Sequence, residues 1–299
     1  MQKFIILGNG FDLHFSFKTS YKDFVDYLNV HYKSEKEYIE SFNLFGDIEK
    51  DSLWMNFEEQ LGSVNTDELG DYQYDIEETK ALYCRLDDIK KELKKVFTAW
   101  INSIKCTIDK PINKDCFFNG DCFILNFNYT KTVERNFEIT PTQIYHIHGI
   151  SDGDIIFGHK PTNEINALMA RYRNSYYDNE EDVIEYPPLY ETSLHFTNEF
   201  VAGLEKPTAK MIKAMHAELS NREIDLSLVE EIMIIGYSYS EVDFPYFEWI
   251  ADVCKNVRWK FGFYSNKDKV NAQKYIQDLK IQNFDIMNTD ALMQELFEK

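Results

Sequence analysis

Apolar and polar positions divide the chain into short strand-like runs and long stretches with a helical period. Residues 3–7 form a short, largely apolar run that ends at Gly8, Asn9 and Gly10. Such a run followed by closely spaced glycines indicates a buried strand that enters a tight turn. Three more short runs, at 122–128, 144–149 and 155–159, are bounded by Asn and Gly and predict further strands.

The middle of the chain follows a helical pattern instead. Between about residues 34 and 105 one apolar stripe recurs at spacings of three and four, at Leu82, Leu86, Ile89, Leu93, Val96 and Trp100. This spacing predicts a long amphipathic helix. Residues 161–225 are mostly helical or loop-like and include an acidic, Tyr-rich stretch at about 176–190 that ends near two prolines. We interpret 34–115 as a helical insertion and 161–225 as a mixed insertion or lid.

Strands and helices alternate again in the last third of the chain. Strands are predicted at 232–236, 258–264 and 284–287, and helices from about 244, at 267–279 and at 290–297. This alternation is typical of a parallel sheet with helices on both faces. The predicted fold class is α/β, an open and mostly parallel Rossmann-like sheet with large helical insertions. Its discontinuous core comprises residues 1–33, 116–160 and 226–299.

Composition narrows the classes of partner. The 299 residues are 44% hydrophobic, and 32 Lys and Arg face 51 Asp and Glu, which gives a net charge of -19. Because nucleic-acid binding depends on neutralising phosphates, nucleic acid is a poor partner for this chain. The five cysteines show no paired metal-ligand spacing, and no apolar stretch is long enough to span a membrane. We expect a cytoplasmic protein without a membrane partner.

Polar side chains follow several predicted strands, where the carboxyl ends of parallel strands face a ligand crevice. The Gly8-Asn9-Gly10 turn is either a phosphate cradle or a plain tight turn, since the third glycine of the dinucleotide fingerprint is absent. Asn128 follows the strand at 122–128 and can orient a water or a ribose hydroxyl, or form a cap or Asx turn.

Histidines are the next candidates. His146 and His148 stand two apart, which places them on one face of a strand, and His148 before Gly149 can serve as a general base. A half-buried structural histidine explains each one equally well. Together with His159 they could bind zinc, but no fourth ligand follows from the spacing, so this reading ranks last and no metal is expected.

A last polar turn follows the strand at 232–236. Gly236 and Ser238 lead to Asp243 and Pro245, which have the character of a helix start. Ser238 can bind phosphate or ribose oxygens, or it can cap. The sequence GYSYS lacks the second glycine of a nucleophile elbow, which argues against a serine hydrolase.

Taken together, the segments resemble one known family. ILGNGFDL, KTSYKDF, LWMNFEEQLG, LNFNYTKTVE, YHIHG, IIFGH and IIGYSYSEVDFPYF, in this order from residue 4 to about 250, resemble the AbiH family of bacteriophage abortive-infection proteins. That family is in turn similar to sirtuin-like NAD-binding folds. The resemblance implies a single nicotinamide nucleotide site at the carboxyl ends of the strands.

The resemblance also implies roles for individual residues. Gly8 and Gly10 are expected to hold pyrophosphate, and Asn128 is expected beside the nicotinamide ribose, with His148 as the base that acts there. The adenosine half would meet the set Gly236, Ser238 and Asn266, and we count Asn9, Asp12 and Gly149 as further nucleotide-binding candidates.

This chain departs from the resembling families at several points. Ser16 and Lys18 stand where AbiH relatives usually have Gly and Pro, and Asp12 stands where sirtuins have a small hydroxyl residue. The four-cysteine zinc module of deacylating sirtuins is absent from the sequence, which argues against protein deacylation.

The expected function is therefore phage defence by cleavage of NAD, the substrate, at its nicotinamide–ribose bond. The alternative is a nucleotide-sensing or partner-binding defence protein of the same fold without chemistry. In both cases the expected ligand is a small nucleotide, with a phage-derived trigger or regulatory partner. The sequence leaves the oligomeric state open.

Overall fold

The structure is a computed structural model of the chain and describes residues 3–41, 57–63, 75–109, 122–151, 153–163, 165–171 and 188–297. Its contacts divide the chain into two compact units, which are described separately here. The sheet unit comprises Met1–Ser20, Ile101–Ile156 and Pro207–Lys299. The helical unit comprises Tyr21–Trp100 and Phe157–Lys206. No helix among the described residues is long and apolar enough to cross a membrane.

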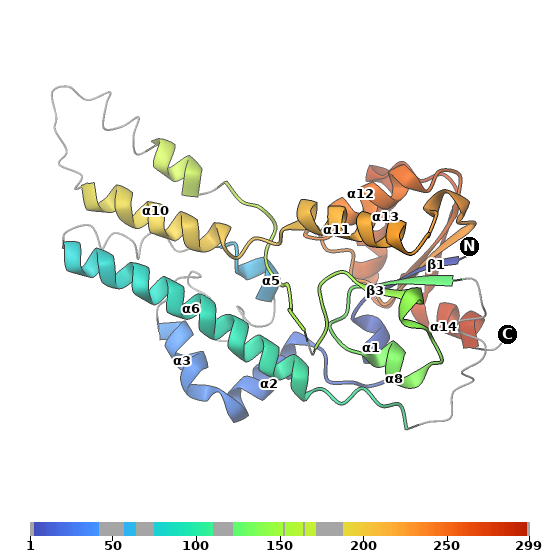
Figure 1. Ribbon diagram of the computed structural model, residues 1–299, viewed down its shortest axis with the longest axis horizontal. Coiled ribbons are helices and arrows are strands. Elements are labelled where there is room, and N and C mark those ends of the chain that lie inside the picture. The colour runs from blue at the N-terminus through green and yellow to red at the C-terminus, as the bar shows by residue number, and fades with distance from the viewer. Residues whose placement is uncertain are drawn as a thin grey trace. The chain divides into compact units, whose positions relative to one another are not determined.

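The sheet unit is built on six parallel strands among the described residues (Figure 1). They are β1 (Lys3–Leu7), β2 (Cys122–Asn126), β3 (Ile144–His146), β4 (Glu231–Ile235), β5 (Arg258–Phe263) and β6 (Phe284–Asn288), in the order β3-β2-β1-β4-β5-β6. This confirms the predicted α/β open-sheet fold. The order is that of dinucleotide-binding folds, whose ligand crevice lies where the strand order reverses, here between β1 and β4.

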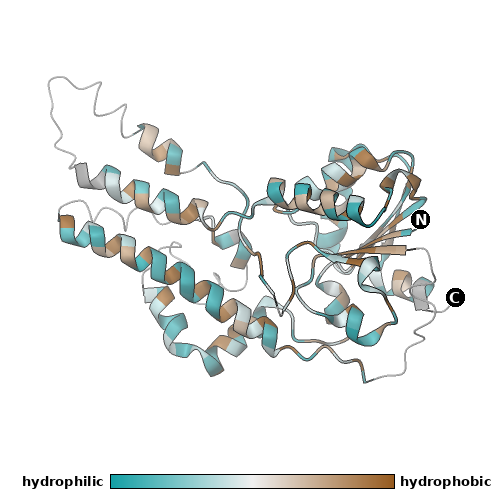
Figure 2. Cartoon of the chain, in the orientation of Figure 1, coloured by the Kyte–Doolittle hydropathy of each residue, from teal (hydrophilic) through white to brown (hydrophobic). Residues whose placement is uncertain are grey.

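Helices cover both faces of this sheet. One face packs against α1 (Gly10–His14), α8 (Thr132–Asn136) and α14 (Thr289–Phe297), and the other against α11 (Thr208–Asn221), α12 (Phe244–Val253) and α13 (Asn266–Asp278). The central strands are apolar on both sides and appear hydrophobic in Figure 2. Because both faces are buried, β1, β2 and β4 read as continuous apolar runs rather than as alternating patterns.

The helical unit contains α2 (Tyr21–His31), α3 (Lys33–Ser41), α5 (Phe57–Gln60), α6 (Ile76–Ser103) and α10 (Pro188–Ala202). The predicted long helix is confirmed as α6, and its stripe from Leu82 to Trp100 is buried. An aromatic cluster fills the space beside it: Phe24 stacks on Trp100, and Phe57 stacks on Phe97. Stacked and edge-to-face rings of this kind bury large apolar areas.

Three features differ from the sequence prediction or add to it. The strand expected at residues 155–159 is wrong, because this segment forms only one isolated bridge, between His159 and Glu205. The short helix α1 is not predicted, since it begins at a glycine. In the predicted lid, α11 packs on the sheet through Met211 and Met215, while residues 176–187 lie outside the described residues.

Candidate functional site

Two glycine turns interlock where the strand order reverses. The turn after β1 and the turn after β4 are joined by hydrogen bonds from Gly8 N to Ile235 O (2.9 Å) and from Gly10 N to Gly236 O (2.7 Å). A Cβ atom on Gly10 would lie 2.7 Å from Gly236 Cα, and Gly236 itself has φ +64. The glycines therefore have a structural role, because they allow the two turns to approach closely. Pyrophosphate binding by these glycines stays a prediction.

Asn128 joins the end of β2 to the first of these turns. Its side-chain amide donates to Gly8 O (3.1 Å), and the whole residue is buried. The Asx-type bond at this strand end belongs instead to Asn126, whose Oδ1 accepts from Asn128 N at 3.0 Å. Asn128 thus lies beyond the end of β2, next to the β1 turn, and its role toward a ligand stays a prediction.

Asp12 is a buried acid on α1 with one unsatisfied oxygen. Its Oδ2 accepts a hydrogen bond from Thr130 Oγ1 at 2.5 Å, whereas Oδ1 is buried and has no hydrogen-bond partner among the described residues. Burial raises the pKa of Asp12 from 3.8 to about 6, against the lowering effects of Thr130, Thr132, His146 and Asn128. A raised carboxyl pKa in a ligand crevice is a property of functional acids.

His146 contacts a carboxylate and a backbone carbonyl at the end of β3. Its Nδ1 lies 3.0 Å from Asn128 O and its Nε2 lies 2.7 Å from Glu134 Oε1. Both ring nitrogens of His146 therefore lie against acceptor oxygens. Burial alone would raise the pKa of Glu134, but the hydrogen bond and charge of His146 lower it overall.

His148 lies just beyond β3 in a different setting. Because β3 ends at His146, the expectation that both histidines share one face of a strand is wrong. The ring of His148 meets Phe127 edge-on (centroids 5.2 Å apart). Its Nε2 lies 3.4 Å from Asp243 Oδ1, at an angle that does not make a hydrogen bond. His148 is therefore a buried imidazole that faces a carboxylate.

The other predicted site residues are spread along the same edge. Asn9 is exposed and its amide donates to Thr19 O at 2.7 Å. Gly149 is half-buried with φ +80. Ser238 is exposed and its carbonyl accepts from Asn271 Nδ2 at 3.1 Å, and Asn266 is the exposed first residue of α13. No hydrogen bond joins either of the last two to Gly8, Asn128 or His148 among the described residues.

The three histidines of the zinc hypothesis do not share an environment. His159 belongs to the helical unit, where its ring nitrogens lie 2.6 Å from Lys160 O and 2.9 Å from Val201 O. His146 is engaged with Glu134, and His148 faces Asp243. Within the described part of the chain, no group of three His, Cys, Asp or Glu side chains could hold a metal ion.

Several residues of the site escape sequence reasoning. Glu134 becomes visible only as the partner of His146, and the contact of Thr130 with Asp12 becomes visible only in the structure. Asp243 is read as a helix start, and it does occupy the N-cap position of α12, but its side chain makes no capping bond. Pro245 could have indicated the missing capping bond. A proline at the second helical position removes one of the N–H groups that usually donate a hydrogen bond to an N-cap side chain.

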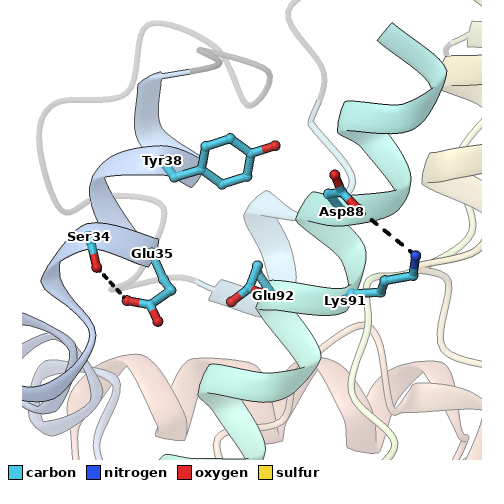
Figure 3. Close-up of a pocket in the computed structure, with 6 residues that line it drawn as sticks. All are labelled: Ser34, Glu35, Tyr38, Asp88, Lys91 and Glu92. Atoms are coloured by element: carbon cyan, nitrogen blue, oxygen red, sulfur yellow. Dashed lines mark hydrogen bonds and ion pairs between the residues drawn. The ribbon is translucent and has the colours of Figure 1, made fainter. Parts of the chain in front are cut away.

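A groove in the helical unit is a different kind of surface. Its cavity is about 430 Å³ and lies between α3 and α6, lined by Ser34, Glu35, Tyr38, Asp88, Lys91 and Glu92. Figure 3 shows that its charged side chains reach their own neighbours, with Ser34 bonded to Glu35 and Lys91 next to Asp88. Pairing among exposed side chains is ordinary for a solvated helix surface, so the functional site is not placed here.

One of three comparisons with known proteins found a match. A family model described as bacteriophage abortive infection AbiH matches residues 4–263, from the second residue of β1 to the last residue of β5. Neither the search of curated proteins nor that of solved structures gave a match. The match covers most of the sequence, and the chain therefore belongs to the AbiH family of bacteriophage abortive-infection proteins.

Proposed function

We propose that the protein acts in phage defence by hydrolysing the nicotinamide–ribose bond of NAD. The observation that carries the proposal is the clustering of polar groups at the switch point of a sheet with the dinucleotide-binding strand order. Asn128 binds the β1 turn there, Asp12 keeps an unsatisfied oxygen there, and His148 faces Asp243 at the neighbouring strand ends. Ligands of open parallel sheets bind at this place.

The chemistry follows from the bond that breaks. When the bond between C1′ of the ribose and the ring nitrogen breaks, its electron pair leaves with nicotinamide and positive charge develops on the ribose. Water then adds to C1′ and gives a proton to His148, the general base. Asn128 orients the water or the ribose hydroxyls, and nicotinamide and ADP-ribose are the products.

In this scheme the buried Asp12 stabilises the positive charge that develops on the ribose. A carboxylate near a ribose that becomes positively charged stabilises the transition state, as acids do in glycoside hydrolysis. The unpartnered Oδ1 can also accept a hydrogen bond from a ribose hydroxyl. With a pKa of about 6, Asp12 is mostly ionised at neutral pH, which this role requires.

The test is nicotinamide release from NAD by the purified protein, assayed alone and with extract of phage-infected cells. The variants His148→Ala and Asn128→Ala are each expected to lower the rate by about 10² to 10⁴-fold. Matched controls are His216→Ala and Asn283→Ala, which change exposed residues of the same unit and should keep the wild-type rate. The proposal fails if the wild type releases no nicotinamide, or if both site variants keep its rate.

A second function is favoured by one observation. The amide of Gly10, which a pyrophosphate cradle would use, already donates to Gly236 O. A protein that senses a nucleotide without cleaving it can bind its ligand through the remaining groups of this edge. Titration calorimetry separates the two, because the sensing function gives heats of binding for NAD or ADP-ribose without nicotinamide release.

A further inference from the structure

The ring of His148 is fixed by apolar neighbours on several sides. Phe127 meets it edge-on, and the rings of Tyr246 and Tyr129 lie 5.9 Å and 6.0 Å from it, centroid to centroid. The residue is 3% exposed. A buried imidazole with an unsatisfied nitrogen is costly unless a polar group compensates it. The polar group that faces Nε2 is Asp243 Oδ1, at 3.4 Å.

Asp243 is held ready for this contact. It precedes α12 at the N-cap position, yet its side chain does not bind the helix amides. Its Oδ2 accepts a hydrogen bond from Tyr237 Oη at 2.9 Å, and this bond fixes the direction of the carboxylate. The other oxygen, Oδ1, is the one that faces His148.

The loop that carries Tyr237 and Asp243 is itself anchored at the switch point. It starts at Gly236, which interlocks with the β1 turn. It also holds Tyr239 at φ +57, with the phenol bonded to Gly262 O at 2.7 Å. A bulky residue in the left-handed region costs of order 1 kcal/mol, and such strain gathers at functional sites.

We propose that Asp243 is the positioning residue of His148. Asp243 Oδ1 accepts a hydrogen bond from the Nε2–H of the imidazole, so that Nδ1 keeps the lone pair that acts as the base. Tyr237 fixes the orientation of Asp243. A carboxylate next to one ring nitrogen sets the tautomer of a histidine. The observed 3.4 Å contact is long and poorly aligned, as catalytic hydrogen bonds often are before a substrate tightens them. The inference rests on the proposed role of His148 as the base.

The experiment reads the tautomer directly and does not need turnover. Nitrogen-15 histidine is incorporated and ring nitrogens are correlated with ring protons by NMR at pH 8, where His148→Gln identifies the His148 signals. The wild type is expected to carry the proton on Nε2 with an unprotonated Nδ1. Asp243→Asn is expected to give a mixture of the two tautomers, and Tyr237→Phe a smaller change in the same direction. Asp252→Asn, an exposed acid on α12, is the matched control and should change nothing.

Kinetics supply the second readout. If NAD is turned over, Asp243→Asn should lower kcat by about 10²-fold or more and change KM little, because the binding groups are kept. A proton on Nδ1 in the wild type, or an unchanged tautomer in Asp243→Asn, overturns the inference. If Asp243→Asn does not fold, the wild-type tautomer and Tyr237→Phe still decide it. A wild type that has the expected tautomer but releases no nicotinamide overturns the proposed function and leaves the positioning of His148 in place.

Discussion

The sheet unit contains two buried charged regions that are built in opposite ways. At the carboxyl edge of β1, Asp12 has one hydrogen-bonded oxygen and one without a partner. On β5, Lys260 lies 3.1 Å from Glu231 and 2.6 Å from Glu295. Burial alone would lower the pKa of Lys260, but the two carboxylates raise it above its usual value. The pKa of Asp12 instead moves toward the uncharged form.

The surroundings thus favour the charged form of Lys260 and disfavour the charged form of Asp12. At Lys260 the two carboxylates favour the charged state of the amine, so the cluster contributes to the stability of the fold. At Asp12 the surroundings disfavour the charged state, and the fold is less stable whenever this acid is ionised. A cost of this kind is what the proposed role of Asp12 in NAD cleavage would explain.

The largest effect is expected where the matched charges are separated. Lys260→Met removes the cation and leaves Glu231 and Glu295 facing each other in a partly buried position. Losing one partner of such a cluster should lower the free energy of unfolding by about 3 kcal/mol. Urea denaturation at pH 7 measures it, with Lys255→Met, which breaks an exposed pair with Asp252, as the control that should hardly change. A loss no greater than that of the control would show that the β5 cluster does not stabilise the fold.

The opposite sign is expected at the carboxyl edge. The rise in the pKa of Asp12 from 3.8 to about 6 corresponds to about 3 kcal/mol against the charged form. This destabilisation of the folded state is fully present above pH 6. It disappears as the pH falls below 3.8, because Asp12 is then protonated in both the folded and the unfolded state. Asp12→Asn, which cannot ionise, should therefore stabilise the protein by up to about 3 kcal/mol at pH 8 and by about half of that at pH 5.

Denaturation of both proteins at the two pH values checks this prediction. Thr130→Val serves as a control in which the acid stays but loses its hydrogen-bond donor. It should destabilise the protein at pH 8, where the acid is charged. Asp12→Asn should also lose NAD cleavage if Asp12 has the proposed role. A variant that is less stable than the wild type at pH 8 would contradict the contrast between the two regions.

The smallest effect concerns backbone strain beside the same acid. Ser16 follows α1 with φ +62, and the amides of Ser16 and Phe17 donate to Leu13 O (2.8 Å) and Asp12 O (3.2 Å). This is a Schellman motif, in which glycine is the preferred residue at the left-handed position. Ser16→Gly should therefore stabilise the protein by up to about 1 kcal/mol. Thermal denaturation measures the gain. Ser16→Ala, which keeps the strain, should give none, and an equal gain in both variants would exclude strain as the cause.

The sequence predicts the sheet well and the site only in outline. Strands β1, β2, β4 and β5 could be found because apolar runs end at Gly, Asn or charged residues, and the edge that carries Asn128 and His148 follows from the rule for parallel strands. The segment at 155–159 is similarly apolar but has no partner strand. No local sequence pattern distinguishes such a segment from a true strand.

The contacts within the site depend on residues that are distant in sequence. Asp12 meets Thr130, and His148 meets Asp243, only after the strands have taken their order. Because β3 ends at His146, His148 lies outside the strand. A pattern of only three residues gives little information on where a strand ends. The sequence shows that Ser16 stands where AbiH relatives usually have Gly. That its backbone is left-handed becomes known only from the structure.

In the proposed function, the carboxyl edge of β1, β2 and β4 cleaves NAD. The most direct measurement is the release of nicotinamide and ADP-ribose from NAD by the purified wild-type protein, beside His148→Ala prepared in the same way. Equal amounts of the two products from the wild type, and almost none from His148→Ala, are the predicted result. No release from the wild type with infected-cell extract present, or equal release from both proteins, would contradict the account.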